Sequence, residues 1–214
     1  MFTKEHARDL SGMECLRRAW YMAKGVESAQ ISTKDVVDQR RHKLLKDVAR
    51  NEHQRLSKRH ITIAEYRAHK EFPWIGSLVD FLQYDQTGRQ GYRREGWRAV
   101  LEVRVVSSYV FRNVKASPTS ADANGIDLYA VQWGMWVNGI KEGQLWMWSP
   151  EYMDGILFDV KYDPLMHDAF ERNAIAIEEE IRKRPKTGTG PERISDGPEC
   201  SRCQFRYACR PTRA

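Results

Sequence analysis

The sequence predicts an α/β fold in which a mixed β-sheet is flanked by helices, and three observations support this fold class. Residues 11–25 and 34–57 have helix signals and helical periodicity. Residues 60–111 change to the composition and period of β-strands. Helical and strand-like segments then alternate to about residue 183. A chain of 214 residues with 41% hydrophobic residues suits a single domain with a packed core.

The first helices follow from capping signals and an apolar stripe. Ser11-Gly-Met-Glu14 is a capping-box pattern, so we expect a helix with Cys15 in its first or second turn. Gly25 would end it. A second helix is predicted from about Lys34 to Ser57. Its buried stripe is expected to be Val37, Leu44, Leu45 and Val48.

The middle of the chain predicts strands with short connections. Residues 60–72 are rich in β-branched and aromatic side chains, and residues 74–84 and 97–111 are predicted strands. Such neighbours favour an antiparallel meander. Residues 115–125 have the composition of a polar loop.

The C-terminal half predicts a helix, two strands and a longer helix. Leu128, Val131 and Met135 have helical spacing, and Gly139 would end their helix. Residues 145–148 and 156–162 are predicted strands. A helix follows Pro164, with a buried side of Phe170, Ile175, Ile177 and Ile181. The predicted organisation is one domain of 1–214, with N-terminal helices in 11–58, a core in 59–183, and a linker with a cysteine cluster in 184–214.

The four cysteines form the most specific motif. Cys15 stands alone, whereas Cys200, Cys203 and Cys209 form a C-x2-C-x5-C group. Such a group in a reducing compartment favours metal binding over disulfides. Four thiolates that are distant in sequence are typical of iron–sulfur clusters. A structural zinc site is the alternative, but zinc ligands usually come as two close pairs. The spacing therefore favours a cluster that joins the N-terminal helix to the C-terminal tail.

Two acidic residues in adjacent predicted strands are the candidates for catalysis. Asp80 and Glu102 are each surrounded by apolar residues, and buried carboxylates usually have a partner or a metal. If the strands pair, both could bind Mg²⁺ or Mn²⁺. Arg104 would lie on the same strand face as Glu102 and could stabilise developing negative charge. The alternative is that both acids are solvated on an exposed face.

Two further polar residues border apolar helix faces. His42 could be a third metal ligand, although a single helical histidine is more often structural or exposed. Gln132 by itself indicates only a polar edge. The net charge of +6 and the pI of about 9.2 moderately favour polyanionic partners. No apolar run approaches the roughly 20 residues of a membrane span, and the N-terminus has no signal-peptide pattern, so we expect a cytoplasmic protein.

The order of these motifs resembles that of the RecB-like nucleases of the PD-(D/E)XK superfamily. Across residues 11–210, Cys15, His42, Asp80, Glu102-Val-Arg104, Gln132 and the C-terminal cysteines occur in the family's order. The similarity is greatest to the CRISPR-associated exonucleases of that group and their phage-encoded relatives. It implies a restriction-endonuclease-like core and a [4Fe–4S] cluster on Cys15, Cys200, Cys203 and Cys209.

The resemblance also implies a function and a set of site residues. His42, Asp80, Glu102 and the carbonyl of Val103 would bind Mg²⁺ or Mn²⁺, and Gln132 would help to orient DNA or the active-site base. The substrate would be single-stranded or end-containing DNA. A protein partner in DNA recombination or CRISPR adaptation is also implied.

The chain departs from the family pattern at Arg104, where the family has lysine. Arginine stays charged and cannot act as a base, although it can stabilise negative charge. Trp136 replaces the usual tyrosine, and the glycine usually found upstream of His42 is absent. Two hypotheses follow from the sequence. One is a metal-dependent DNA exonuclease, and the other is a catalytically impaired DNA-binding or partner-binding module on the same fold.

Overall fold

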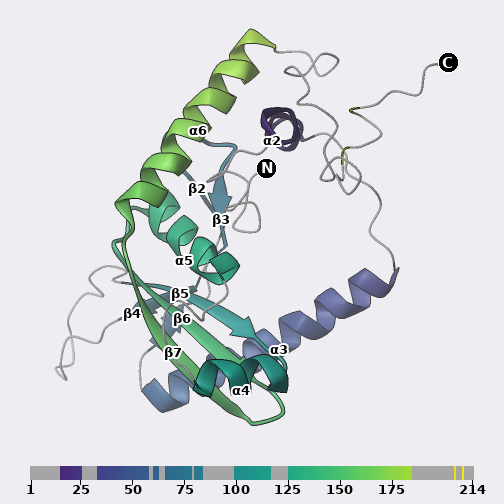
Figure 1. Cartoon of the computed structure of the whole chain (residues 1–214), viewed down its shortest axis with the longest axis vertical. Helices are drawn as coiled ribbons and strands as arrows, with labels where there is room; N and C mark the ends of the chain where they lie inside the picture. The colour runs from purple at the N-terminus through teal and green to yellow at the C-terminus, as the bar shows by residue number, and fades with distance from the viewer. Residues whose placement is uncertain are drawn as a thin grey trace.

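The computed structural model describes most of the chain between Cys15 and Arg184 (Figure 1). The described residues are 15–25, 33–57, 60–62, 66–78, 80–83, 99–116 and 125–184, together with Phe205 and Cys209. Cys200 and Cys203 lie outside this set, as do the capping box before Cys15 and most of the 184–198 linker. No helix among the described residues is long and apolar enough to cross a membrane.

The N-terminal helices lie close to where the sequence predicted them. Helix α2 spans Leu16–Ala23, and Gly25 follows it with a φ of 68°. Such left-handed backbone suits glycine and commonly ends a helix. Cys15 is the N-cap rather than a member of the first turn, and its Sγ accepts a hydrogen bond from the Arg18 amide at 3.4 Å. Helix α3 spans Thr33–Ser57.

A five-stranded mixed sheet forms the centre of the fold. Its order is β1-β4-β5-β6-β7, in which β5 and β6 are parallel and the other neighbours are antiparallel. The strands are β1 (His60–Thr62), β4 (Asp80–Gln83), β5 (Ala99–Val105), β6 (Glu142–Ser149) and β7 (Asp154–Lys161). A separate ribbon pairs β2 (Arg67–Ala68) with β3 (Gly76–Ser77). The predicted mixed α/β sheet is therefore confirmed, and so is the antiparallel pairing of its first strands.

Helices cover both faces of the sheet. Helix α4 (Ser108–Ala116) and helix α5 (Gly125–Asn138) pack with alternate residues of the central strands, such as Val100 and Met147. On the other face, Ala49 of α3 packs in one cluster with Leu101 and Trp148. Strand β5 is thus buried from both sides, as expected for a central strand with parallel pairing.

A third apolar cluster joins α2, α5 and the long helix α6 (Pro164–Lys183). The Asp163 side chain caps α6 and Pro164 begins it, which is a favourable helix start. Trp20, Trp133 and Phe170 are fully buried in this cluster. Phe205, from the C-terminal segment, is also part of it.

Several predictions about local structure were wrong. The single strand predicted over residues 74–84 is divided into β3 and β4, which belong to different sheets. Residues from Ser108 onward form α4, whereas the sequence predicted a strand as far as residue 111. The α3 residues Val37, Leu44 and Val48 are exposed, so of the predicted apolar stripe Leu45 alone packs against the sheet. The buried side of α3 carries Ala49 and His53 instead, and it packs on apolar residues of the sheet such as Trp146. On α6, Ile175 is exposed.

Candidate active site

The two predicted acidic residues lie on paired strands in the interior. Strands β4 and β5 are antiparallel, and Asp80 is opposite Leu101, which directly precedes Glu102. Asp80 is 5% exposed and Glu102 is 3% exposed. The sequence prediction that both carboxylates are buried is confirmed. The alternative, that they are solvated on an exposed strand face, is excluded.

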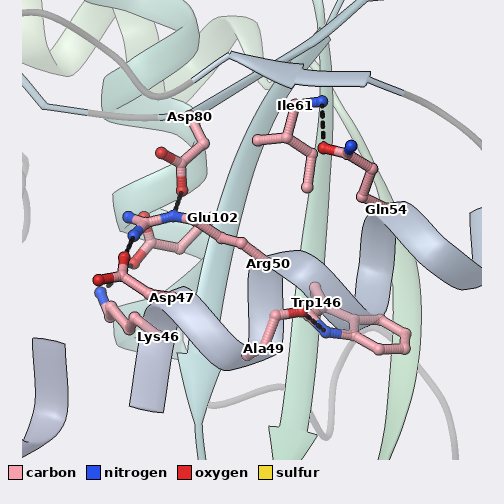
Figure 2. A network of polar contacts seen from close by, with 9 residues as sticks. All are labelled: Lys46, Asp47, Ala49, Arg50, Gln54, Ile61, Asp80, Glu102 and Trp146. Carbon is pink, nitrogen blue, oxygen red and sulfur yellow. Dashed lines mark hydrogen bonds and ion pairs between the residues drawn. The ribbon is translucent and has the colours of Figure 1, made fainter. Parts of the chain in front are cut away.

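One turn of α3 provides basic partners for both acids (Figure 2). The Arg50 Nε donates to Asp80 Oδ2 at 2.6 Å. The Lys46 Nζ lies 3.5 Å from Glu102 Oε1. Because residues four apart lie on the same side of a helix, Lys46 and Arg50 point in the same direction. The two acids therefore face a single basic surface of α3.

Arg50 is held from two sides. Its Nη1 donates to Asp47, on the same helical turn, while its Nε donates to Asp80. Burial lowers the pKa of Arg50, but the hydrogen bond and the charge of Asp80, together with the charge of Asp47, outweigh burial and raise the pKa above its ordinary value. Arg50 is therefore a permanent cation at this site, and it compensates the desolvation of Asp80.

The basic groups lie nearer to solvent than the acids. The side chains of Lys46 and Arg50 are 18% and 19% exposed, against 3% for Glu102 and 6% for Asp80. Of these four side chains, the two cations are therefore the ones that solvent can reach. This order of burial matters for any ligand that carries negative charge.

The other residues of the predicted metal set lie nearby in the fold. His42 is on an exposed part of α3, one turn before Lys46. Val103 is buried in β5, and Arg104 follows it in a half-buried position. Within the described part of the chain, no three His, Cys, Asp or Glu side chains gather into a cation site. The ligand set of His42, Asp80, Glu102 and Val103 thus stays a prediction.

Gln132 connects α5 to the junction of β7 and α6. Its Nε2 donates to the Lys161 carbonyl at 2.6 Å, and its Oε1 accepts from the Asp163 amide at 3.1 Å. These two bonds fix the orientation of the amide, so His167 Nε2, at 3.0 Å from the same Oε1, must be a donor. Gln132 is 4% exposed. In this arrangement its amide anchors the start of α6.

His167 is a buried neutral histidine. Burial lowers its pKa to about 4, although the charge of the nearby Asp163 acts in the opposite direction. A neutral imidazole keeps one proton, and the hydrogen bond to Gln132 places that proton on Nε2. The Gln132–His167 pair is therefore a neutral hydrogen bond at pH 7.

The described cysteines lie beside the third apolar cluster. Cys15 caps α2, and Cys209 packs against the cluster that contains Trp20 and Tyr21. The rings of Tyr21 and Phe205 are 5.5 Å apart between centroids. The C-terminal cysteine segment therefore contacts the helix that Cys15 begins.

The sequence did not indicate that Lys46, Asp47 and Arg50 belong to this site. Charged residues on a surface helix usually face solvent, and α3 carries many of them. One signal was available in retrospect, because two buried carboxylates on a sheet require counter-charges from the element that packs on them. Lys46 and Arg50 have the spacing to provide these counter-charges from one helical turn.

Comparison with solved structures shows the same fold in exonucleases. An alkaline exonuclease from Laribacter hongkongensis matches with a TM-score of 0.61 and 12% identity, over 85% of this chain and 87% of that one. The same enzyme in complex with dAMP gives a TM-score of 0.63, 13% identity, and coverage of 85% and 88%. A phage-related exonuclease from Haemophilus somnus 129PT gives 0.57 and 10% identity, over 83% and 92% of the two chains.

No protein-family model matches the sequence, and no curated protein matches it. The similarity therefore lies in the path of the chain rather than in its residues. The protein has an α/β fold with a mixed sheet that is similar to the fold of these exonucleases.

Proposed function

We propose that this protein is a metal-dependent deoxyribonuclease, an exonuclease that hydrolyses phosphodiester bonds of DNA. The observation that carries the proposal is the pair of buried carboxylates, Asp80 and Glu102, on adjacent strands of this fold. The exonuclease fold of the structural neighbours supports the same class of reaction. The dAMP bound to one neighbour is a nucleotide ligand of the kind that DNA hydrolysis releases.

The donor chemistry of the site fits a divalent cation. Carboxylate oxygens are hard ligands of the kind that Mg²⁺ and Mn²⁺ prefer, and both groups are nearly inaccessible to solvent. Asp80 and Glu102 would hold the ion, with His42 and the carbonyl of Val103 as further ligands. When bound, such an ion activates water and stabilises charge on the phosphate. Arg104 would add positive charge beside Glu102 without acting as a base.

A [4Fe–4S] cluster on Cys15, Cys200, Cys203 and Cys209 is part of the proposal. The packing of Phe205 on Tyr21, with Cys209 beside the same cluster, supports a link between the two ends of the chain. The cluster would serve to hold the C-terminal segment against α2. Chemistry at Asp80 and Glu102 would not involve it.

A second candidate function is a DNA-binding or partner-binding module that has lost cleavage. Arg50 favours it, because its side chain already neutralises Asp80 in the structure. A permanent ion pair at a ligand oxygen competes with any metal ion for that oxygen. The two candidates differ in whether a divalent cation displaces this pair.

A cleavage assay separates the candidates. Protein purified without oxygen is incubated with single- and double-stranded DNA in Mg²⁺ or Mn²⁺, beside Asp80→Asn and the exposed control Asp168→Asn. The nuclease proposal predicts metal-dependent hydrolysis that Asp80→Asn abolishes and Asp168→Asn retains. Folded protein that binds DNA and leaves it intact in both metals would establish the binding module instead.

A further inference from the structure

We infer that Lys46 and Arg50 of α3 form a clamp for the phosphodiester that enters the site. This inference extends the proposed function and rests on it for the position of the substrate. It starts from the geometry of one helical turn, in which two basic groups reach the two buried acids from the same side (Figure 2). Both residues lie on α3, where the sequence indicated only one functional residue, the candidate metal ligand His42.

The balance of charge on this turn favours an anionic ligand once a cation is bound. Asp47, Asp80 and Glu102 outnumber Lys46 and Arg50 by one charge among the ion pairs of this turn. A divalent cation on the acids would make the group net positive. A phosphodiester carries one negative charge, so it would be attracted to the turn once a cation is bound, and Arg104 on the strand of Glu102 would add to this attraction.

Two acids hold Arg50 in place. Its two arms contact different acids, Asp80 through Nε and Asp47 through Nη1. If Asp80 binds a cation, Asp47 still retains the guanidinium at its place on α3. The Nε–H group that donated to Asp80 is then available to a phosphate oxygen. A guanidinium binds phosphate through directed, charge-assisted hydrogen bonds.

Lys46 is more loosely held than Arg50, and both cations are more exposed than the acids. The Lys46 Nζ is 3.5 Å from Glu102, a distance that a small rotation of its side chain can lengthen. Lys46 and Arg50 retain about a fifth of their exposure, whereas the acids have almost none. The two cations therefore keep a solvent-accessible surface that a DNA phosphate can contact. Lys46 would be a compact cation close to the phosphate, a role that the bulkier Arg104 fills less well.

The test uses charge-neutralising variants with controls on the same helix. The variants are Lys46→Gln and Arg50→Gln, and the controls are Lys43→Gln and Arg55→Gln, whose side chains are exposed. DNA affinity is measured over a range of salt concentrations with Ca²⁺ in place of Mn²⁺. The affinity of the protein for Mn²⁺ is measured by calorimetry without DNA, and cleavage is measured in Mn²⁺. Thermal melting reports folding.

The clamp predicts opposite effects on the two ligands. Each variant should bind DNA roughly 10-fold more weakly than the wild type. The slope of log affinity against log salt concentration should correspond to about one fewer released counterion. Affinity for Mn²⁺ should rise roughly threefold or more, because a competing positive charge has been removed. The controls should stay within about twofold for both ligands. A residue that serves only as a structural counter-ion of the acids would raise Mn²⁺ affinity in the same way but would not lower DNA affinity, so the loss of DNA affinity distinguishes the clamp.

Two results would overturn the inference. One is a loss of DNA affinity no larger than in the controls, and the other is a fall in Mn²⁺ affinity in a folded variant. If the Gln variants do not fold, Arg50→Lys is tested instead, because lysine keeps the charge but cannot contact Asp80 and Asp47 through two separate nitrogens. DNA affinity of Arg50→Lys equal to that of the wild type would then reject the clamp. Absence of cleavage by the wild-type protein would reject the nuclease proposal, whereas the two binding measurements would still decide on the clamp.

Discussion

Arginine at position 104 differs from lysine in two ways that affect a hydrolytic site. It stays charged at every relevant pH, and its planar group is bulkier than an ammonium. It follows two residues after Glu102 on the same strand and is half-buried. Position 104 can therefore provide charge near the acids, but it cannot accept a proton from water.

Arg104→Lys should accelerate DNA cleavage by about 10-fold, because a lysine can contact the attacking water more closely and can lose its proton. The measurement is single-turnover cleavage in Mn²⁺. The matched control is Arg112→Lys, at an exposed position of α4, which should leave the rate unchanged. A rate for Arg104→Lys at or below the wild-type value would show that the arginine is adapted to this site.

His167 should make folding stability depend on pH. Its pKa is about 4 in the folded protein because of burial, and about 6.5 in the unfolded chain. Since the folded pKa is depressed, the unfolded state binds more protons between these values, and stability falls as the pH decreases from about 6.5 toward 4. At higher pH the contribution is fully present.

The variant His167→Gln lacks this titration but can keep a donor toward Gln132. Between pH 7 and pH 5, the wild-type free energy of unfolding should fall by about 1–2 kcal/mol more than that of the variant. Urea unfolding at the two pH values measures the difference. Parallel pH dependence of the two proteins would show that His167 is not the titrating group.

Prediction of single site residues succeeded where local sequence determines burial. Asp80 and Glu102 are flanked by apolar residues, and both are buried as expected. Lys46 and Arg50 could not be identified in this way, because their partners are distant in sequence and lie on two strands. The hydrogen bonds of Gln132 to the β7–α6 junction also depend on tertiary structure that its neighbours do not encode.

At the scale of elements, the close contact between α5 and β6 depends on a glycine. A Cβ built on Gly143 would lie 2.5 Å from Val131 Cγ1 and 2.8 Å from Met135 Sδ. Both side chains are fully buried in the cluster on this face of the sheet, so they have little space to move. The absence of a side chain at position 143 therefore sets the distance between helix and sheet.

Gly143→Ala should destabilise the fold by about 1–3 kcal/mol, because α5 has to shift outward or its side chains must leave their preferred rotamers. Chemical denaturation measures the change in the free energy of unfolding. The control is Glu142→Ala at the exposed neighbouring position. Equal stability of Gly143→Ala and this control would mean that the packing of α5 tolerates the extra methyl group.

The positions of most helices and strands could be predicted, whereas their buried faces and exact ends were harder to predict. Helix α5 and the β6–β7 pair lie where the periodicity predicts them. Helix α4 was missed because Tyr109-Val-Phe111 continues the strand-like composition of β5. The buried face of α3 was missed because the residues that pack on the sheet there, Ala49 and His53, are small or polar and do not form an apolar stripe in the sequence.

At the scale of the whole molecule, the two ends of the described chain meet at one apolar cluster. Tyr21 of α2 and Phe205 of the C-terminal segment are in contact, and Phe170 of α6 lies in the same cluster. The sequence predicted this approach from the cysteine spacing alone. The proposed [4Fe–4S] cluster would reinforce a contact that the apolar side chains already make.

Protein purified without oxygen should be brown and absorb near the border of visible and ultraviolet light. Cys203→Ala should remove this absorption and lower the melting temperature, since metal binding and folding are coupled. Ser201→Ala, within the same cysteine group, should retain both. Colourless wild-type protein that contains stoichiometric zinc would replace the iron–sulfur proposal with a structural zinc site.

The central claim is that buried carboxylates on β4 and β5 support hydrolysis of DNA. Its most direct test is the release of nucleotides from end-labelled DNA in Mn²⁺ by the wild-type protein, Glu102→Ala and the exposed control Glu142→Ala. We predict metal-dependent release by the wild type and the control, and none by Glu102→Ala. Equal release by Glu102→Ala, or none by folded wild-type protein that binds DNA, would contradict the claim.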